Sequence, residues 1–228
     1  MGSTIRPPCL KSPRQVAMLG DSYVAAPSFI GQSIVAAAVA DRALQSGQSY
    51  TDYSVPGTTL LSGQIPGQLD QALRAYPELK TVISDGGGND IIGSVTCLND
   101  GAAADRMCMM LVGQLIDAYK GMAMKAKAAG VTDFIIFLYP DNVPIGGADI
   151  LRYSVKAGRE LETQLTTPDF RVYLLDTAPL MKDHPTWYVD GLIHVNADGS
   201  KLIGDAVYKI MKDNCIAQPE SSGCCDPG

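Results

Sequence analysis

Short apolar runs alternate along the chain with longer segments of helical composition. Strands are expected where the runs have β-strand length and composition, at about residues 15–19, 50–55, 80–84, 132–139 and 170–175. The run at 132–139 is apolar without interruption from Phe134 to Leu138, which is typical of a strand buried on both faces. We therefore expect this strand at the centre of a sheet.

Helical segments follow these strands in turn. The expected helices cover about residues 29–45, 64–76, 103–129, 150–165 and 197–213. Strands that alternate with helices form βαβ units, whose crossovers are right-handed. The expected fold class is therefore α/β, a three-layer α/β/α sandwich around a central parallel five-stranded sheet.

The chain is long and apolar enough to form a sizeable core. It has 228 residues, of which 46% are hydrophobic and 18% charged, and no internal repeat or linker interrupts it. This composition is globular. We expect one domain over residues 1–228, with its core at about 14–215 and termini rich in Pro, Gly, Ser and Cys at 1–13 and 216–228.

The charge pattern and hydropathy exclude two classes of partner. The net charge is −6 and no run of Lys or Arg is present, so the chain lacks the basic surface that nucleic-acid binding requires. The longest mostly apolar run, Phe29 to Ala40, has about twelve residues, whereas a transmembrane helix needs roughly 20. We expect a soluble protein, and a monomer.

Six cysteines indicate disulfides and therefore an oxidising compartment. The first expected pair is Cys97–Cys108, a loop closure that stabilises by about 3 kcal/mol. The other four cysteines lie near the two ends of the chain, where disulfides can hold the termini in place: Cys9, Cys215, Cys224 and Cys225. Their pairing is left open, except that the neighbours Cys224 and Cys225 are expected to bond to other cysteines, because a bond between adjacent residues is strained. A zinc site is less well supported, because only two histidines are present. The start, Met1 to Thr4, has no signal-like apolar stretch, so we expect a removed signal peptide and a secreted or periplasmic protein.

Ligands of parallel α/β sheets bind beyond the carboxyl ends of the strands. Four loops at this edge carry residues suited to catalysis: Gly20-Asp21-Ser22, Gly57-Thr58-Thr59, Gly86-Gly87-Gly88-Asn89-Asp90, and a long loop with His184, Asp190 and His194. Together they supply a hydroxyl nucleophile, backbone donors, an amide and the only imidazoles. This set of groups suits acyl transfer.

Only a histidine can act as the base for a serine nucleophile here. His194 follows Asp190 by four residues, a spacing that allows a carboxylate to orient the imidazole. His184 has Asp183 beside it and Pro185 after it, which makes such a contact harder. We therefore favour His194.

Each of the other candidates also has a purely structural interpretation. Ser22 is a helix cap or a nucleophile near the free N–H groups of a helix start. Gly57 is a turn residue or a backbone donor that approaches the substrate closely, and Asn89 is a turn residue or an amide donor to an oxyanion. Their order along one sheet edge favours the catalytic interpretation.

These four blocks resemble those of the SGNH, or GDSL-type, hydrolases, and they span residues 20–194. The resemblance implies a flavodoxin-like fold in which Ser22 attacks an ester carbonyl, His194 acts as base and then acid, and Asp190 orients His194. It further implies an oxyanion hole of the Ser22 and Gly57 N–H groups with the Asn89 side chain, structural roles for Asp21 and Asp90 in supporting the loops, and no metal or organic cofactor.

Two positions depart from the family pattern. Tyr23 replaces the leucine that gives the motif its name, at a position that varies in the family. The family usually has Asp three residues before His, whereas one more residue separates Asp190 from His194. The loop must therefore bulge, or the carboxylate comes from elsewhere, with Asp183 in reserve.

The function expected is that of a secreted serine esterase for short- to medium-chain acyl esters, on a small molecule or a polymer. The alternatives are a carbohydrate O-acetylesterase, an acyltransferase, or a catalytically silent module that binds glycans or esters. Trp187 either contacts the acyl chain or sugar, or anchors its loop. The segment between Cys97 and Cys108 is a candidate wall of the site, and three methionines either line it or, the favoured interpretation, belong to a helix core: Met107, Met109 and Met110.

Overall fold

The computed structural model describes residues 7–94, 97, 102–140, 143 and 148–225. It contains one sheet of five strands in the order β2-β1-β3-β4-β5, with every neighbouring pair parallel. The strands are β1 (Val16–Leu19), β2 (Thr51–Asp52), β3 (Thr81–Ser84), β4 (Asp133–Phe137) and β5 (Arg171–Leu175). This 2-1-3-4-5 order is that of flavodoxin-like folds.

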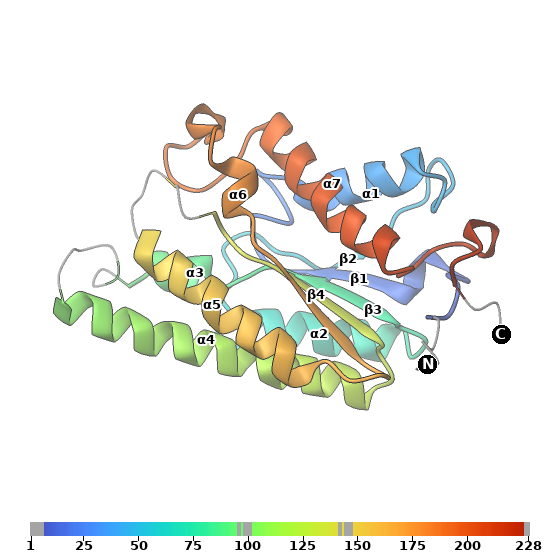
Figure 1. The fold of residues 1–228 in the computed structure, drawn as a ribbon, viewed down its shortest axis with the longest axis horizontal. Helices are drawn as coiled ribbons and strands as arrows, with labels where there is room; N and C mark the ends of the chain where they lie inside the picture. Colours follow the sequence, from blue (N-terminus) through green and yellow to red (C-terminus); the bar gives the residue numbers. More distant parts are fainter. Residues whose placement is uncertain (1–6, 95–96, 98–101, 141–142, 144–147, 226–228) are drawn as a thin grey trace.

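Helices cover both faces of the sheet (Figure 1). One face carries α1 (Ile30–Ala40) and α7 (Ala197–Asp213), and the other carries α2 (Gln64–Ala75), α4 (Ala102–Ala128) and α5 (Ala148–Leu165). Two apolar clusters, one on each side of the sheet, form the core. The expected three-layer α/β/α sandwich is therefore confirmed, and none of the helices described here is both long and apolar enough to cross a membrane.

The expected central position of β4 in the sheet was wrong. The middle strand is β3, and β4 lies next to it, because β5 pairs on the far side of β4. Burial on both faces was the signal used for β4, and all its residues are indeed buried, but β1 and β3 are equally buried. Burial identifies an interior strand without ranking the interior strands.

Boundaries differ where local hydrogen bonds compete with regular structure. The edge strand β2 ends at Asp52, whose carboxylate accepts hydrogen bonds from the backbone N–H and hydroxyl of Ser54. Two short helices, α3 (Gly88–Ile92) and α6 (Ala178–Met181), lie in loops where no helix was expected. Both are too short for a helical period to be visible in the sequence.

The three methionines near the start of α4 are exposed, so the favoured interpretation of them as part of a helix core was wrong. The exposed fractions are 58% for Met107, 43% for Met109 and 69% for Met110. The buried face of α4 is formed instead by residues at helical spacing, including Cys108, Val112, Leu115, Tyr119 and Met122.

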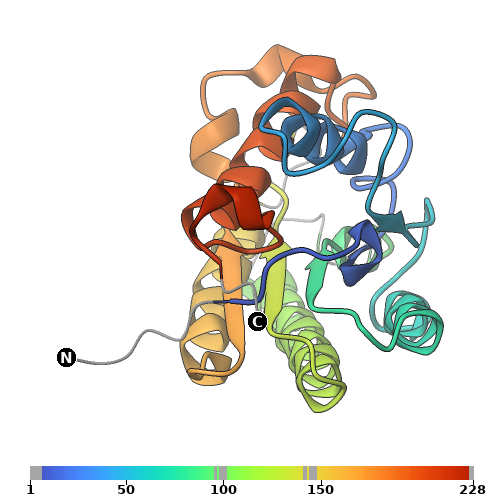
Figure 2. The same cartoon turned by 90° about the vertical axis from the view of Figure 1, so that its right-hand side faces the viewer.

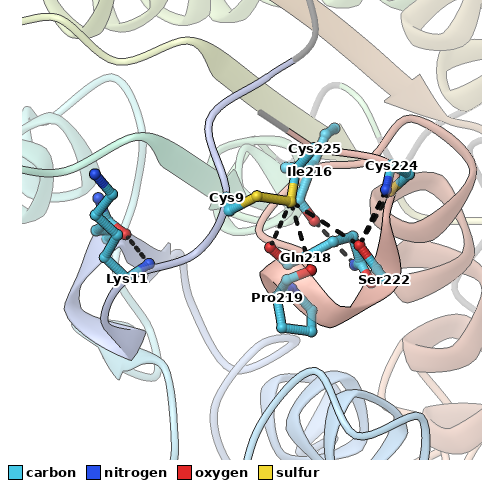
Figure 3. The surroundings of a disulfide bond; sticks show 9 residues. Cys9, Lys11, Ile216, Gln218, Pro219, Ser222, Cys224 and Cys225 are labelled. Carbon is cyan, nitrogen blue, oxygen red and sulfur yellow. Dashed lines mark hydrogen bonds between the residues drawn. A yellow bond between two sulfur atoms is a disulfide. The ribbon is translucent and has the colours of Figure 1, made fainter. Parts of the chain in front are cut away.

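Two disulfides close the chain on itself. Cys97 pairs with Cys108, as expected, and anchors the segment after α3 to α4. Cys9 pairs with Cys225, and near it the backbone N–H of Leu10 donates to the carbonyl of Gln218, so the segments around Cys9 and Cys225 lie side by side (Figures 2 and 3). Of the four terminal cysteines only these two form a disulfide, and Cys215 and Cys224 are thiols.

Candidate active site

Ser22 lies at the carboxyl end of β1, in a turn that a buried glycine begins. Gly20 has a φ of +143°, and a Cβ atom on it would lie 1.5 Å from Oδ1 of Asp85, so only glycine fits there. Helix α1 begins only at Ile30, so Ser22 is not the helix cap that the sequence also allowed. The turn presents the Ser22 hydroxyl at the edge of the sheet, almost fully buried.

The Ser22 hydroxyl contacts the imidazole of His194. Ser22 Oγ lies 2.7 Å from His194 Nε2, across 172 residues of sequence. The other ring nitrogen, Nδ1, contacts Oδ2 of Asp190. The structure therefore brings together Ser22, His194 and Asp190 in one hydrogen-bonded chain.

The extra residue between Asp190 and His194 is accommodated by a bulge. Gly191 adopts a φ of +67°, and the backbone N–H groups of Leu192, Ile193 and His194 all donate to Oδ1 of Asp190, at 2.8, 3.1 and 3.2 Å. Partial burial opposes ionisation, but the Leu192 N–H and the His194 side chain outweigh it and lower the pKa of Asp190. One oxygen of the Asp190 carboxylate thus holds the backbone of its own loop, while the other contacts the His194 ring.

Asp183, the reserve carboxylate, and His184, the less favoured base, lie outside this hydrogen-bonded chain. Asp183 is exposed, and no hydrogen bond or ion pair joins it to His194 among the residues that the structure describes. The His184 ring stacks on Trp187, with 3.7 Å between centroids and planes 12° apart. Trp187 also packs against the core cluster below α1 and α7, in agreement with the interpretation of it as a loop anchor.

Two backbone N–H groups near Ser22 have no acceptor among the described residues: those of Ser22 itself and of Gly57. Gly57 is exposed with a φ of +80°, and a Cβ there would touch nothing within 4 Å. Glycine is therefore required at position 57 by its backbone conformation rather than by lack of space.

The Asn89 amide faces the same region but is already occupied. Its Nδ2 atom donates to Oδ2 of Asp21 at 3.1 Å and to the Thr58 carbonyl at 2.9 Å. Both amide hydrogens thus have protein acceptors. Donation to an oxyanion would require one of these bonds to be shared or exchanged.

Asp90 holds the loop that contains Gly57. Its two carboxylate oxygens accept the backbone N–H groups of Leu60 at 2.8 Å and Leu61 at 3.0 Å. These bonds connect α3 to the loop after β2.

Sequence reasoning missed two side chains beneath Ser22. Asp85 directly follows β3 and Tyr139 follows β4, and the Tyr139 hydroxyl contacts both Asp85 and Asp21. Burial raises the pKa of both carboxyl groups, and the Asp21 charge raises that of Asp85 further. Both residues follow strands at the edge where ligands of parallel sheets bind, so this rule could have identified them, but the candidates named after the strand at 80–84 started at Gly86.

An open groove of about 650 Å³ lies beside the loop that carries His194. Its lining comes from residues 27–36, from Val189 and from residues 195–200. Phe29, 44% exposed, and Val189, 59% exposed, contribute apolar surface, and Gln32, Ser33 and Asn196 contribute polar groups.

The arrangement has the parts that acyl transfer uses: a hydroxyl bonded to an imidazole, a carboxylate on the other ring nitrogen, and backbone N–H groups that have no acceptor among the described residues. Among the described residues, no group of three or more His, Cys, Asp or Glu side chains is arranged to hold a metal ion.

Solved structures of low sequence identity share this fold. An acetyl xylan esterase, AlAXEase, is 14% identical with a TM-score of 0.61, and the match covers 86% of this chain and 98% of that one. A carbohydrate esterase of family 3 from Talaromyces cellulolyticus is 16% identical with a TM-score of 0.66, covering 88% and 97%. The lipase Lip_vut3 from a goat rumen metagenome is 16% identical with a TM-score of 0.62, covering 87% and 96%.

A search of curated proteins finds no match. Residues 18–202, which contain every block described above, match the model of the GDSL-like lipase/acylhydrolase family. The chain therefore belongs to the GDSL-like lipase/acylhydrolase family.

Proposed function

We propose that this protein is a serine esterase that hydrolyses carboxylic esters through an acyl-enzyme on Ser22. Membership of an acylhydrolase family supports ester hydrolysis. The observation that carries the finer assignment is the continuous hydrogen-bonded chain from Ser22 Oγ through His194 to Asp190.

In the first half-reaction, His194 Nε2 takes the Ser22 proton as Oγ attacks the ester carbonyl. Asp190 stabilises the imidazolium that forms and keeps the ring oriented. The imidazolium then gives its proton to the departing alcohol, which leaves the acyl group on Ser22. In the second half-reaction, His194 deprotonates a water molecule that attacks the acyl-enzyme, and the proton returns to Ser22 as the acid leaves.

Negative charge develops on the carbonyl oxygen in both half-reactions. The Ser22 and Gly57 N–H groups have no acceptor among the described residues, and the Asn89 amide is the third donor. We assign this oxyanion hole to those three groups. Because both hydrogens of the Asn89 amide have acceptors, its contribution requires sharing or exchange of one bond.

Ser22→Ala tests the nucleophile. A fluorophosphonate probe should label the wild type, and the substitution should abolish labelling and reduce turnover of a short aryl ester by roughly 10⁴- to 10⁶-fold. Ser221→Ala, which changes an exposed serine on the C-terminal tail, is the matched control and should keep both. Labelling that survives in Ser22→Ala overturns the proposal, and the absence of turnover with any ester favours a silent binding module.

The carboxylate role is tested by two aspartates. Asp190→Ala should lower kcat by roughly 10⁴-fold, as loss of a triad carboxylate does elsewhere. Asp183→Ala, in the exposed neighbour, should leave kcat unchanged. The reverse result would move the role to Asp183.

A carbohydrate O-acetylesterase is the second candidate. It is favoured by the names of structural neighbours, which include acetyl xylan esterases, and by the open groove with an exposed Phe29 next to amide and hydroxyl groups. Esters of increasing acyl length, compared with acetylated xylan, separate the two. A steep preference for acetyl groups on xylan would select the second candidate, whereas tolerance of medium chains selects the first. Transfer to an added alcohol in place of water would indicate an acyltransferase.

The two disulfides favour an oxidising compartment, so we also propose that the protein acts outside the cytoplasm.

A further inference from the structure

Three buried side chains meet beneath the Ser22 turn, at the ends of three neighbouring strands. Asp21 follows β1, Asp85 follows β3 and Tyr139 follows β4. The Tyr139 hydroxyl oxygen lies 2.9 and 2.8 Å from Oδ1 and Oδ2 of Asp21, and 3.2 Å from Oδ2 of Asp85. Asp21 is 1% exposed and Asp85 is fully buried, so bulk solvent does not screen the two carboxyl groups from each other.

These contacts need one more proton than two carboxylates and a phenol supply. A phenol has a single hydrogen to donate, yet its oxygen faces two carboxyl groups. If both were ionised, one carboxylate oxygen would face a phenol lone pair, and two like charges would be buried together. A proton on one carboxyl group removes both problems.

The remaining donors decide which group carries that proton. Asp21 also accepts the Tyr23 N–H on Oδ1 at 3.0 Å and the Asn89 amide on Oδ2 at 3.1 Å, so donors surround its anionic form. Apart from the Tyr139 hydroxyl, the Asp21 N–H is the one group among the described residues that bonds to the Asp85 side chain, on Oδ1 at 3.0 Å, so Oδ2 can donate to the phenol. The resulting order of donation is Asp85 to Tyr139 to Asp21.

Other titratable groups near the pair agree with this order. The phenols of Tyr23 and Tyr119 are buried and have pKa values raised by that burial, so neither contributes a charge. Tyr119 donates to the Gly86 carbonyl and not to either carboxyl group. The imidazolium that the proposed mechanism forms on His194 would favour an anion on Asp21.

We propose that Asp85 and Tyr139 are positioning residues: a protonated Asp85 and the Tyr139 hydroxyl fix Asp21 as the one anion of these three side chains, and that anion aligns the amide of Asn89. This inference rests on the proposed function for the role of Asn89 as an oxyanion donor. The assignment of the proton to Asp85 does not depend on that role.

Kinetics test the positioning. Tyr139→Phe removes only the hydroxyl and should lower kcat by roughly 10-fold or more, up to the roughly 10²- to 10³-fold that loss of an oxyanion donor costs, with KM changed less than twofold. Tyr119→Phe is the matched control, since it deletes another buried hydroxyl beside Gly86, and it should stay near the wild-type kcat. Equal effects of the two substitutions overturn the positioning role.

Two replacements of Asp85 distinguish the need for a hydrogen-bond donor at this position from the need for a negative charge. Asn donates to Tyr139 as the protonated acid does, so Asp85→Asn should retain at least a third of the wild-type kcat, whereas Asp85→Ala should lose as much as Tyr139→Phe. If Asp85→Asn falls as far as Asp85→Ala, the group acts as a charge and the proposal fails. Should Asp85→Ala not fold, Tyr139→Phe supplies the comparison.

Infrared difference spectra test the proton without any substrate. At neutral pH the wild type should show the carbonyl band of a protonated carboxylic acid, shifted in heavy water and missing from Asp85→Asn. Persistence of the band in that variant refutes the assignment. If the band behaves as expected while Ser22 is not labelled by a fluorophosphonate, the proposed function fails and the proton assignment stands.

Discussion

One part of the pH dependence of this protein's stability should come from Asp85. Because burial and the Asp21 charge raise its pKa well above the usual value, the folded protein keeps a proton that the unfolded chain loses near pH 4. A raised folded pKa gives a stabilisation that is complete below the unfolded pKa and is lost as the pH rises towards the folded pKa. Asp85→Asn removes this dependence, because Asn holds its hydrogens at every pH.

The expected magnitude follows from linkage. Between the two pKa values the folded state binds one proton more than the unfolded state, so the wild type loses about 1.4 kcal/mol of unfolding free energy per pH unit relative to Asp85→Asn. The second amide hydrogen of Asn adds a pH-independent cost of about 1–3 kcal/mol if it lacks an acceptor. That cost shifts the whole curve and leaves its slope unchanged.

Urea unfolding of the oxidised proteins at pH 5, 6, 7 and 8 measures the difference. The variant should gain on the wild type with each step in pH, until the curve levels off at the folded pKa of Asp85. Charges elsewhere are common to both proteins and cancel. A free-energy difference that stays constant from pH 5 to 8 would show that Asp85 is ionised when folded, and the reasoning would be wrong.

Three further substitutions probe the packing and the loops. Gly204→Ala should destabilise the protein by about 1–3 kcal/mol in thermal melts, because the new Cβ would lie 2.5 Å from Cβ and 2.9 Å from the carbonyl carbon of Ser33 on α1. Gly121→Ala, on the open face of α4, should instead stabilise it by about 0.5–1 kcal/mol. Stability changes of the same sign in both variants would contradict the packing argument. Gly191→Ala should lower kcat, because the left-handed backbone at this position costs a residue with a Cβ about 1–2 kcal/mol. Gly191→Asn should recover part of the lost kcat. Equal kcat values for the two variants would show that the bulge tolerates any residue. Asp90→Ala leaves two backbone N–H groups of the loop after β2 without acceptors, so it should lower kcat for an aryl ester. Asp90→Asn keeps one acceptor and should recover part of that kcat. A wild-type kcat in the alanine variant would refute the supporting role of Asp90.

Periodicity and composition located the five strands and five of the seven α-helices in the part of the chain that the structure describes. The long helices were visible because each has enough turns to repeat its pattern, as α4 does over residues 102–128. The short helices α3 and α6 were not, and the middle position of β3 in the sheet was missed because burial alone does not rank interior strands. Strand order depends on which edges pair, and no local pattern records it.

Exposure was the least predictable property of single side chains. An apolar side chain such as Met110 predicts burial on average, but its position on the outer face of α4 leaves it in solvent. The disulfide Cys97–Cys108 was predictable because few residues separate its members, whereas Cys9–Cys225 joins the two ends of the chain and had three possible partners at the C-terminus.

By itself, the sequence determined the fold class and a short set of candidates for the chemistry, because two histidines and four motif blocks at strand ends leave few combinations. Only the tertiary structure decided that Asp190 rather than Asp183 contacts His194, since that contact depends on the left-handed bulge at Gly191. The tertiary structure alone also brought Asp21, Asp85 and Tyr139 together. Their proximity arises from the pairing of β1 with β3 and of β3 with β4, and such contacts across 54 to 118 residues have no local signature in a sequence.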